Sequence, residues 1–144
     1  HLLSFERVEL NAAGTAFVTR ALEGEYEYPE DRLILTGDWG NDRWGFYATI
    51  NYVGKFQDQP DVDFDGTLDY DTNTTRDVGA WTTVNLQFRY TGIENVRFQF
   101  GMDNVLDEEP PFAVGDGDTD LYGYVQSQHS PRGSFWNAKA IVEF

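Results

Sequence analysis

The chain of 144 residues has no cysteine, few basic residues and no long apolar run. Without cysteine it forms neither a disulfide framework nor a thiolate metal site. No stretch approaches the roughly 18 apolar residues of a membrane helix, and no basic-then-apolar signal opens the chain. Its 25 acidic and 10 basic residues give a formal net charge of −15. That charge opposes binding to nucleic acid or to an anionic membrane surface by attraction.

Aromatic residues are abundant, at 16% of the chain, while 14 glycines and 5 prolines divide the sequence into short runs. This composition favours an all-β fold. Five segments alternate apolar and polar residues with a period of two, as strands with two unlike faces do. They are Arg32–Trp39, Trp44–Phe56, Thr83–Tyr90, Val96–Asp103 and Ser134–Phe144. One further strand is expected before Tyr28.

The connections between these segments alternate between short and long. Tight turns are expected at Gly40–Arg43 and Thr91–Asn95, whereas residues 57–80 and 104–133 run without periodicity. Compact soluble domains prefer connections of about 4–6 residues, but outer-membrane β-barrels combine short turns at one end with long loops at the other. The pattern therefore predicts antiparallel strands of a transmembrane β-barrel. A sheet with one face in water is the alternative.

Aromatic residues stand near both ends of the predicted strands, as they do in the aromatic girdles of membrane barrels. Those at the short-turn end are Trp39, Trp44, Tyr90 and Phe144. Those expected to form a second girdle at the opposite rim are Tyr52, Phe56 and Trp136. The middle of each apolar face is small or aliphatic, which a sheet in water does not require.

Two stretches near the end of the chain, "MDNVLDEEPPFA" and "SPRGSFWNAKAIVEF", resemble the end of the β-barrel of TonB-dependent outer-membrane receptors. Upstream, "YPEDRLILTGDW", "YVGKF" and "WTTVNLQFRY" resemble the same family in the expected order. The resemblance covers about Tyr28 to Phe144.

The resemblance implies that residues 1–144 are the C-terminal part of a barrel of about 22 strands, a fragment without the family's plug domain. It implies a place in the outer membrane of a Gram-negative cell, in contact with lipid. Energy-coupled uptake of a scarce nutrient is then expected, such as a ferric siderophore or another metal chelate, cobalamin or an oligosaccharide. TonB would act through the N-terminal region that is absent here. Trp136, Val142 and Phe144 in the last strand would signal to the barrel-assembly machinery.

The stretch "DVDFDGTLDYD" follows the first part of a calcium-binding loop. Asp61, Asp63, Asp65 and Asp69 occupy positions at which carboxylates converge on calcium, and Gly66 permits the sharp turn. Thr72 stands where the bidentate glutamate belongs. A soluble all-β calcium-binding module of the adhesion or lectin type is therefore the alternative function, and a solvated acidic loop is the plainer interpretation.

A second acidic cluster, Asp116, Asp118 and Asp120, lies in the other long stretch and could share a cation with the first. Catalysis has little support. His129 precedes Ser130, but the sequence sets no acidic partner to orient the histidine. We expect a protein that is not an enzyme, has no cofactor other than a possible calcium ion, and carries His129 at a loop base beside Pro131.

Overall fold

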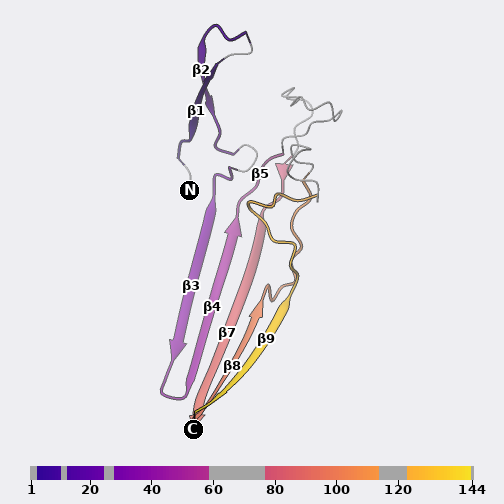
Figure 1. Ribbon diagram of the computed structural model, residues 1–144. Coiled ribbons are helices and arrows are strands. Elements are labelled where there is room, and N and C mark those ends of the chain that lie inside the picture. Colours follow the sequence, from indigo (N-terminus) through magenta and orange to yellow (C-terminus); the bar gives the residue numbers. More distant parts are fainter. Residues whose placement is uncertain (1–2, 11–12, 25–27, 59–76, 114–122, 144) are drawn as a thin grey trace. The chain divides into compact units, whose positions relative to one another are not determined.

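The computed structural model describes residues 3–10, 13–24, 28–58, 77–113 and 123–143. These residues form antiparallel sheets and contain no helix (Figure 1), so the predicted all-β class is confirmed. None of the described residues belongs to a helix long and apolar enough to cross a membrane. The chain divides into two compact units. The first comprises residues 1–32, 53–81 and 110–130, and the second comprises residues 33–52, 82–109 and 131–144.

The second unit is built on one sheet of five strands in the order β3-β4-β7-β8-β9. The strands are β3 (Arg32–Gly40), β4 (Trp44–Val53), β7 (Trp81–Ile93), β8 (Val96–Asp103) and β9 (Phe135–Val142). Figure 1 shows them side by side, with neighbours running in opposite directions. The five strands predicted from alternation are therefore present, with ends shifted by a few residues.

The register of the last strand pair separates the residues of the two faces. Phe98 faces Ala140, and Phe100 faces Ala138, which places large rings opposite small side chains. The intervening pair is Gln99 with Lys139. Because successive side chains in a strand point to opposite faces, one face of the sheet is apolar and the other polar.

Both predicted short turns are present, and local hydrogen bonds form them. The Asn41 Oδ1 atom accepts hydrogen bonds from the backbone N–H groups of Arg43 and Trp44, each at 2.9 Å. In the β7–β8 turn Asn95 adopts a φ of 57°, a left-handed conformation that asparagine tolerates. The strands are joined there by two residues, since Ile93 pairs with Val96.

Asn104 ties the end of β8 to the segment before β9. Its buried side chain donates to the carbonyl oxygen of Glu108 at 3.0 Å and to that of Arg132 at 3.3 Å. Its own backbone N–H donates to Asn85 Oδ1 at 2.9 Å. Asp107 Oδ1 accepts the backbone N–H of Ser134 at 2.7 Å. These hydrogen bonds satisfy backbone groups of an irregular loop.

The first unit contains two small hairpins. Strands β1 (Glu6–Leu10) and β2 (Phe17–Ala21) pair directly, so the prediction of one strand before Tyr28 is wrong. Each of these strands has five residues, and Gly14 between them has a φ of 64°. Their shortness left little alternation for a sequence pattern to show. The second hairpin pairs β5 (Phe56–Gln57) with β6 (Asp77–Val78).

A small apolar core holds the first unit together. Its members are Val53, Phe56, Val78, Trp81, Ala113 and Val125, all of them buried. His129 stacks on Phe56 at 5.9 Å between ring centroids and meets Trp81 edge to face at 5.4 Å.

Two predictions for this part of the chain are corrected. Phe56 is 2% exposed and belongs to the core, so it cannot lie in an outward-facing girdle. The strand predicted at Trp44–Phe56 is too long at its C-terminal end. Strand β4 ends at Val53, and Gly54 packs against the backbone of Asp31. His129 lies in a loop beside Pro131, as predicted, and its side chain is buried against the core.

Candidate functional site

The apolar face of the five-stranded sheet carries large aromatic side chains that no described residue covers. Trp39 is 62% exposed and Trp136 is 59% exposed. The other aromatic residues on this face include Trp44, Phe46, Phe88, Phe98 and Phe100, which are 37–42% exposed. Monomeric soluble proteins rarely leave so large a continuous apolar surface open.

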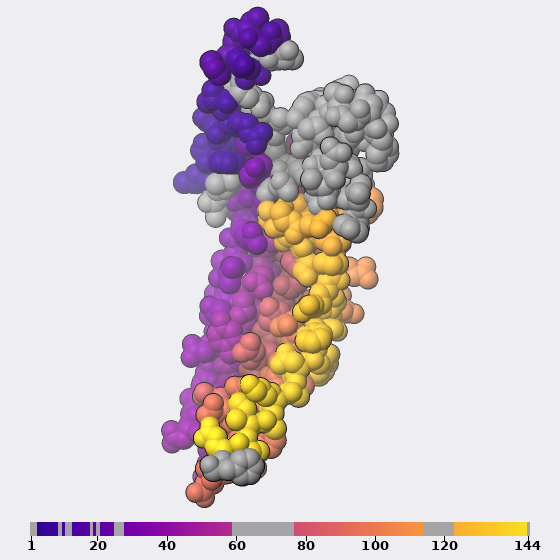
Figure 2. All heavy atoms as spheres, viewed as in Figure 1, coloured from indigo at the N-terminus to yellow at the C-terminus, as the bar shows by residue number. Residues whose placement is uncertain are grey.

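Ring contacts join two pairs of neighbouring strands on this aromatic face. Trp44 of β4 lies 4.2 Å from Tyr90 and 5.3 Å from Phe88, both of β7. Phe100 of β8 meets Trp136 of β9 at 5.4 Å. The space-filling view in Figure 2 shows the strands from β3 (purple) to β9 (yellow) at the surface along their length. Phe88 of β7 and Phe100 of β8 are register partners, which places the two groups of rings side by side on the sheet.

The aromatic residues are not confined to the ends of the strands, because Phe88 of β7 and Phe98 and Phe100 of β8 pair within the sheet. Trp44 begins β4 directly after the first short turn, and Tyr90 lies beside the second. Trp136 pairs with Met102 near the opposite end of β8. An extra residue on β7 between Tyr90 and Ile93 forms a bulge, and the ring of Tyr90 occupies the space above Gly92.

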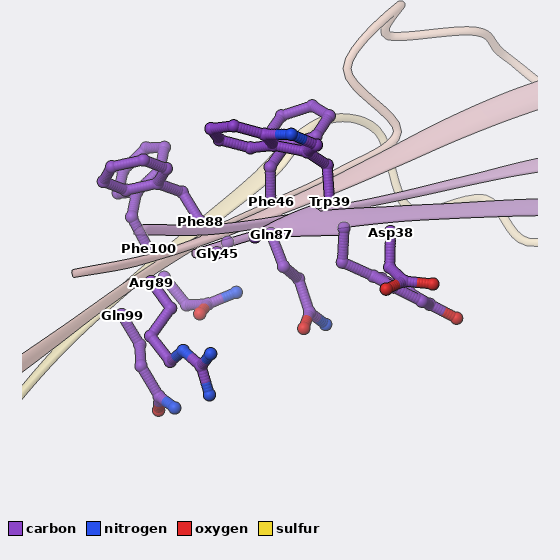
Figure 3. Close-up of a pocket in the computed structure, with 13 residues that line it drawn as sticks. Asp38, Trp39, Gly45, Phe46, Gln87, Phe88, Arg89, Gln99 and Phe100 are labelled. Carbon is purple, nitrogen blue, oxygen red and sulfur yellow. The ribbon is translucent and has the colours of Figure 1, made fainter. Parts of the chain in front are cut away.

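The opposite face is polar and contains a hollow of about 570 Å³. The polar side chains that line it are Asp38, Tyr47, Gln87, Arg89, Gln99 and Asn137. In Figure 3, Asp38, Gln87, Arg89 and Gln99 project from one side of the sheet, whereas Trp39, Phe46, Phe88 and Phe100 project from the other. The two faces thus offer chemically different surfaces.

Glycines form the floor of the hollow. A Cβ atom added to Gly45 would lie 3.2 Å from Arg89 Nε, so the guanidinium group lies over that glycine. A Cβ atom added to Gly101 would lie 2.6 Å from Asn137 Nδ2. Since glycine has no side chain, the long polar residues lie flat against the backbone and leave open space above them.

The charges on the polar face are mostly not paired with one another. Arg97 Nη2 lies 3.9 Å from Glu143 Oε1. Among the described residues Asp38, Arg89 and Lys139 form no ion pair. An exposed charged group without a protein partner is available to a ligand or to an ion.

Not all predicted site residues are within the described part of the chain. Trp136 and Val142 lie on the apolar face of β9 and are 59% and 50% exposed. Phe144 and the acidic residues Asp61, Asp63, Asp65, Asp69, Asp116, Asp118 and Asp120 lie outside the described residues. Within the described residues, no group of three His, Asp or Glu side chains could hold a metal ion.

Sequence reasoning missed the hollow, although a signal was present. Gly40, Gly45 and Gly101 alternate in step with the polar residues of their strands. Glycine within a strand often marks a place where another group approaches the backbone closely. Only the strand order shows that these three glycines share one region of one sheet.

No protein-family model, curated protein or solved structure matches this chain. Its functional interpretation therefore rests on the two faces of the sheet.

Proposed function

We propose that the five-stranded sheet is part of the wall of a transmembrane β-barrel, with its aromatic face in lipid and its polar face lining a water-filled lumen. The observation that carries the proposal is that the two faces are opposite in polarity and both exposed. In a barrel of this kind apolar side chains point to lipid, polar ones point to the lumen, and aromatic girdles mark both interfaces. Lipid would cover the patch that no described residue covers.

The edges of the sheet support the same proposal. In the described part of the chain β3 and β9 each pair with one neighbour only. Unpaired backbone groups are unfavourable in lipid, so membrane sheets close on themselves. Five strands are fewer than the roughly 8 that a small barrel needs. Additional strands would therefore complete the wall, as expected for the C-terminal part of a larger barrel domain.

The proposed class is an outer-membrane TonB-dependent receptor that imports a scarce nutrient. The stretch that resembles this family contains Asn104 and Asp107, whose hydrogen bonds hold the segment that leads into β9. In this proposal Trp136, Val142 and Phe144 mark the last strand for the barrel-assembly machinery. Candidate ligands are ferric siderophores, cobalamin and oligosaccharides, and the protein has no enzymatic activity.

Single cysteine variants test the proposal directly, because the native chain has no cysteine. A spin label attached to the cysteine of Phe88→Cys or Phe100→Cys lies on the aromatic face. A label attached in Gln87→Cys or Gln99→Cys lies on the polar face. In phospholipid vesicles, labels on the first pair should respond to oxygen dissolved in lipid, and labels on the second pair to a water-soluble nickel chelate.

Equal response of all four labels to the nickel chelate would overturn the barrel proposal. A chain that also stays monodisperse without detergent and melts at higher temperature with calcium would be a soluble calcium-binding module.

A further inference from the structure

The hollow on the polar face contains one acidic and one basic side chain that do not pair with each other. Asp38 of β3 and Arg89 of β7 both line it and form no ion pair among the described residues. Strand β4 lies between their two strands. Opposite charges that share a hollow without touching leave room for a molecule that contacts both.

The glycines set the spacing of these two charges. The Arg89 guanidinium lies over Gly45, and the Cβ position of Gly40 is 3.5 Å from Gly45 Cα, so β3 and β4 are close at this point. Asp38 precedes Gly40 by two residues on the same face. With about 3.3 Å per residue along a strand and about 4.8 Å between strands, the backbone of Asp38 lies roughly 8 Å from Gly45, over which the guanidinium lies.

The surface between the two charges can form hydrogen bonds. Gln87 and Gln99 line the hollow on the same side as Asp38 and Arg89 (Figure 3). A carboxamide offers two N–H donors and one acceptor oxygen, and a guanidinium binds a carboxylate through two parallel N–H groups. A ligand with a carboxylate at one end and an ammonium at the other would satisfy Arg89 and Asp38 together.

We propose that this hollow binds a small zwitterionic solute, such as an amino acid, with its carboxylate on Arg89 and its ammonium on Asp38. The inference goes beyond the proposed function, because it needs only that the polar face is wet. We expect a dissociation constant in the millimolar range, since both charged groups are exposed to water.

The experiment titrates the full chain in detergent micelles with ω-amino acids from glycine to 6-aminohexanoate. The readouts are the nuclear magnetic resonance signals of the Arg89 Nε–H and of the Gln87 and Gln99 side-chain amides. Affinity should be highest for chains of two to four carbons and at least about 5-fold weaker for 6-aminohexanoate. Succinate and 1,4-diaminobutane, which carry one sign of charge, should bind at least about 5-fold more weakly than the best zwitterion.

Matched variants distinguish specific binding in the hollow from nonspecific electrostatic attraction of the solute to the polar face. Arg89→Gln and Asp38→Asn should each weaken binding of the best zwitterion by about 10-fold. Arg97→Gln removes the same charge from the same face but does not line the hollow, so it should change affinity less than 2-fold. Arg89→Lys keeps the charge, loses the paired N–H groups, and should give an intermediate affinity.

Affinity that does not depend on chain length, or an equal effect of Arg97→Gln and Arg89→Gln, would overturn the proposal. So would unchanged binding in Asp38→Asn with retained β-sheet circular dichroism. The accessibility of spin labels to oxygen and nickel is measured separately, so failure of the barrel proposal is distinguishable from failure of this one.

Discussion

At the scale of single residues, Asn104 is the side chain with the clearest structural role. It is 5% exposed, has a φ of 47°, and joins three segments through its amide and backbone groups. Glu108 donates its backbone N–H to Asn104 Oδ1 at 3.1 Å. A buried polar group left without partners costs about 1–3 kcal/mol. Residues 104–108 and the backbone at Arg132 therefore depend on Asn104 for several of their hydrogen bonds.

We predict that Asn104→Ala lowers the free energy of unfolding by about 2–4 kcal/mol, because several hydrogen bonds are lost and backbone groups lose their partners. Urea unfolding in detergent micelles measures the change. Asn51→Ala is the control, since Asn51 donates to Thr83 Oγ1 at 3.4 Å, a long hydrogen bond. Similar losses in the two variants would contradict a special role for Asn104.

Glu23 is a second residue with a testable local effect. Backbone N–H groups of Glu23 itself, of Phe5 and of Leu22 lower the pKa of the Glu23 carboxyl below its usual range. Phe5 N donates to Glu23 Oε2 at 3.2 Å, and the Phe5 ring contacts that of Tyr28 in a tilted arrangement with centroids 4.9 Å apart. The carboxylate thus helps to attach the segment before β1.

Folding lowers the pKa of the Glu23 carboxyl. The stabilisation from its hydrogen bond with Phe5 should therefore be fully present above the pKa that Glu23 has in the unfolded chain, and it should be lost as the pH falls through the folded-state pKa. Carbon-13 titration of the Glu23 carboxyl in folded and urea-unfolded chains measures both values. Glu23→Gln should remove this part of the pH dependence at Phe5. An equal pKa in the two states would contradict the prediction.

At the scale of the strand, each element of the five-stranded sheet presents two environments in alternation. Ala138 of β9 lies on the aromatic face opposite Phe100, whereas Gln87 of β7 lies on the polar face opposite Gly101. An arginine at Ala138 would enter lipid if the proposed function is right. One at Gln87 would enter water.

Ala138→Arg should destabilise the chain folded in lipid vesicles by about 2–4 kcal/mol, as an arginine near the bilayer midplane does. Gln87→Arg adds the same charge on the polar face and should cost less than about 1 kcal/mol. Folding measured by urea titration in vesicles gives both values. A larger loss for Gln87→Arg would reverse the assignment of the two faces.

At the scale of the whole molecule, the chain combines two kinds of stability. The first unit has a small buried core around Val78, which is fully buried. The sheet of the second unit keeps its large apolar residues exposed, so burial within the described residues contributes less to its stability, and in the proposed barrel lipid would cover that face. The two units should therefore respond differently to the same change of solvent or sequence.

Val78→Ala should destabilise the first unit by about 2 kcal/mol, because the cavity it leaves removes packing from a small core. Hydrogen exchange followed by mass spectrometry should show faster exchange in residues 53–58 and 77–81. Exchange in β8 and β9 should stay within about 2-fold of the native chain. Equal acceleration in both units would show that they unfold as one.

Prediction from sequence worked best where one physical rule determines the result. The period of two in Val96–Asp103 predicted both the strand and its apolar face, because a strand has no other way to arrange its side chains. It failed at Phe56, where alternation continued past the end of β4. A pattern of residues does not show where strand pairing stops and a core begins.

The sequence by itself determined that the chain is all-β, that it contains five long strands, and that their faces differ in polarity. Those properties follow from local rules of alternation and turn formation. The tertiary structure alone decided that Phe56 and His129 are buried together and that Asp38 and Arg89 share a hollow. These residues are 73 and 51 positions apart in the chain. Strand order and packing bring them together, and no local pattern encodes either.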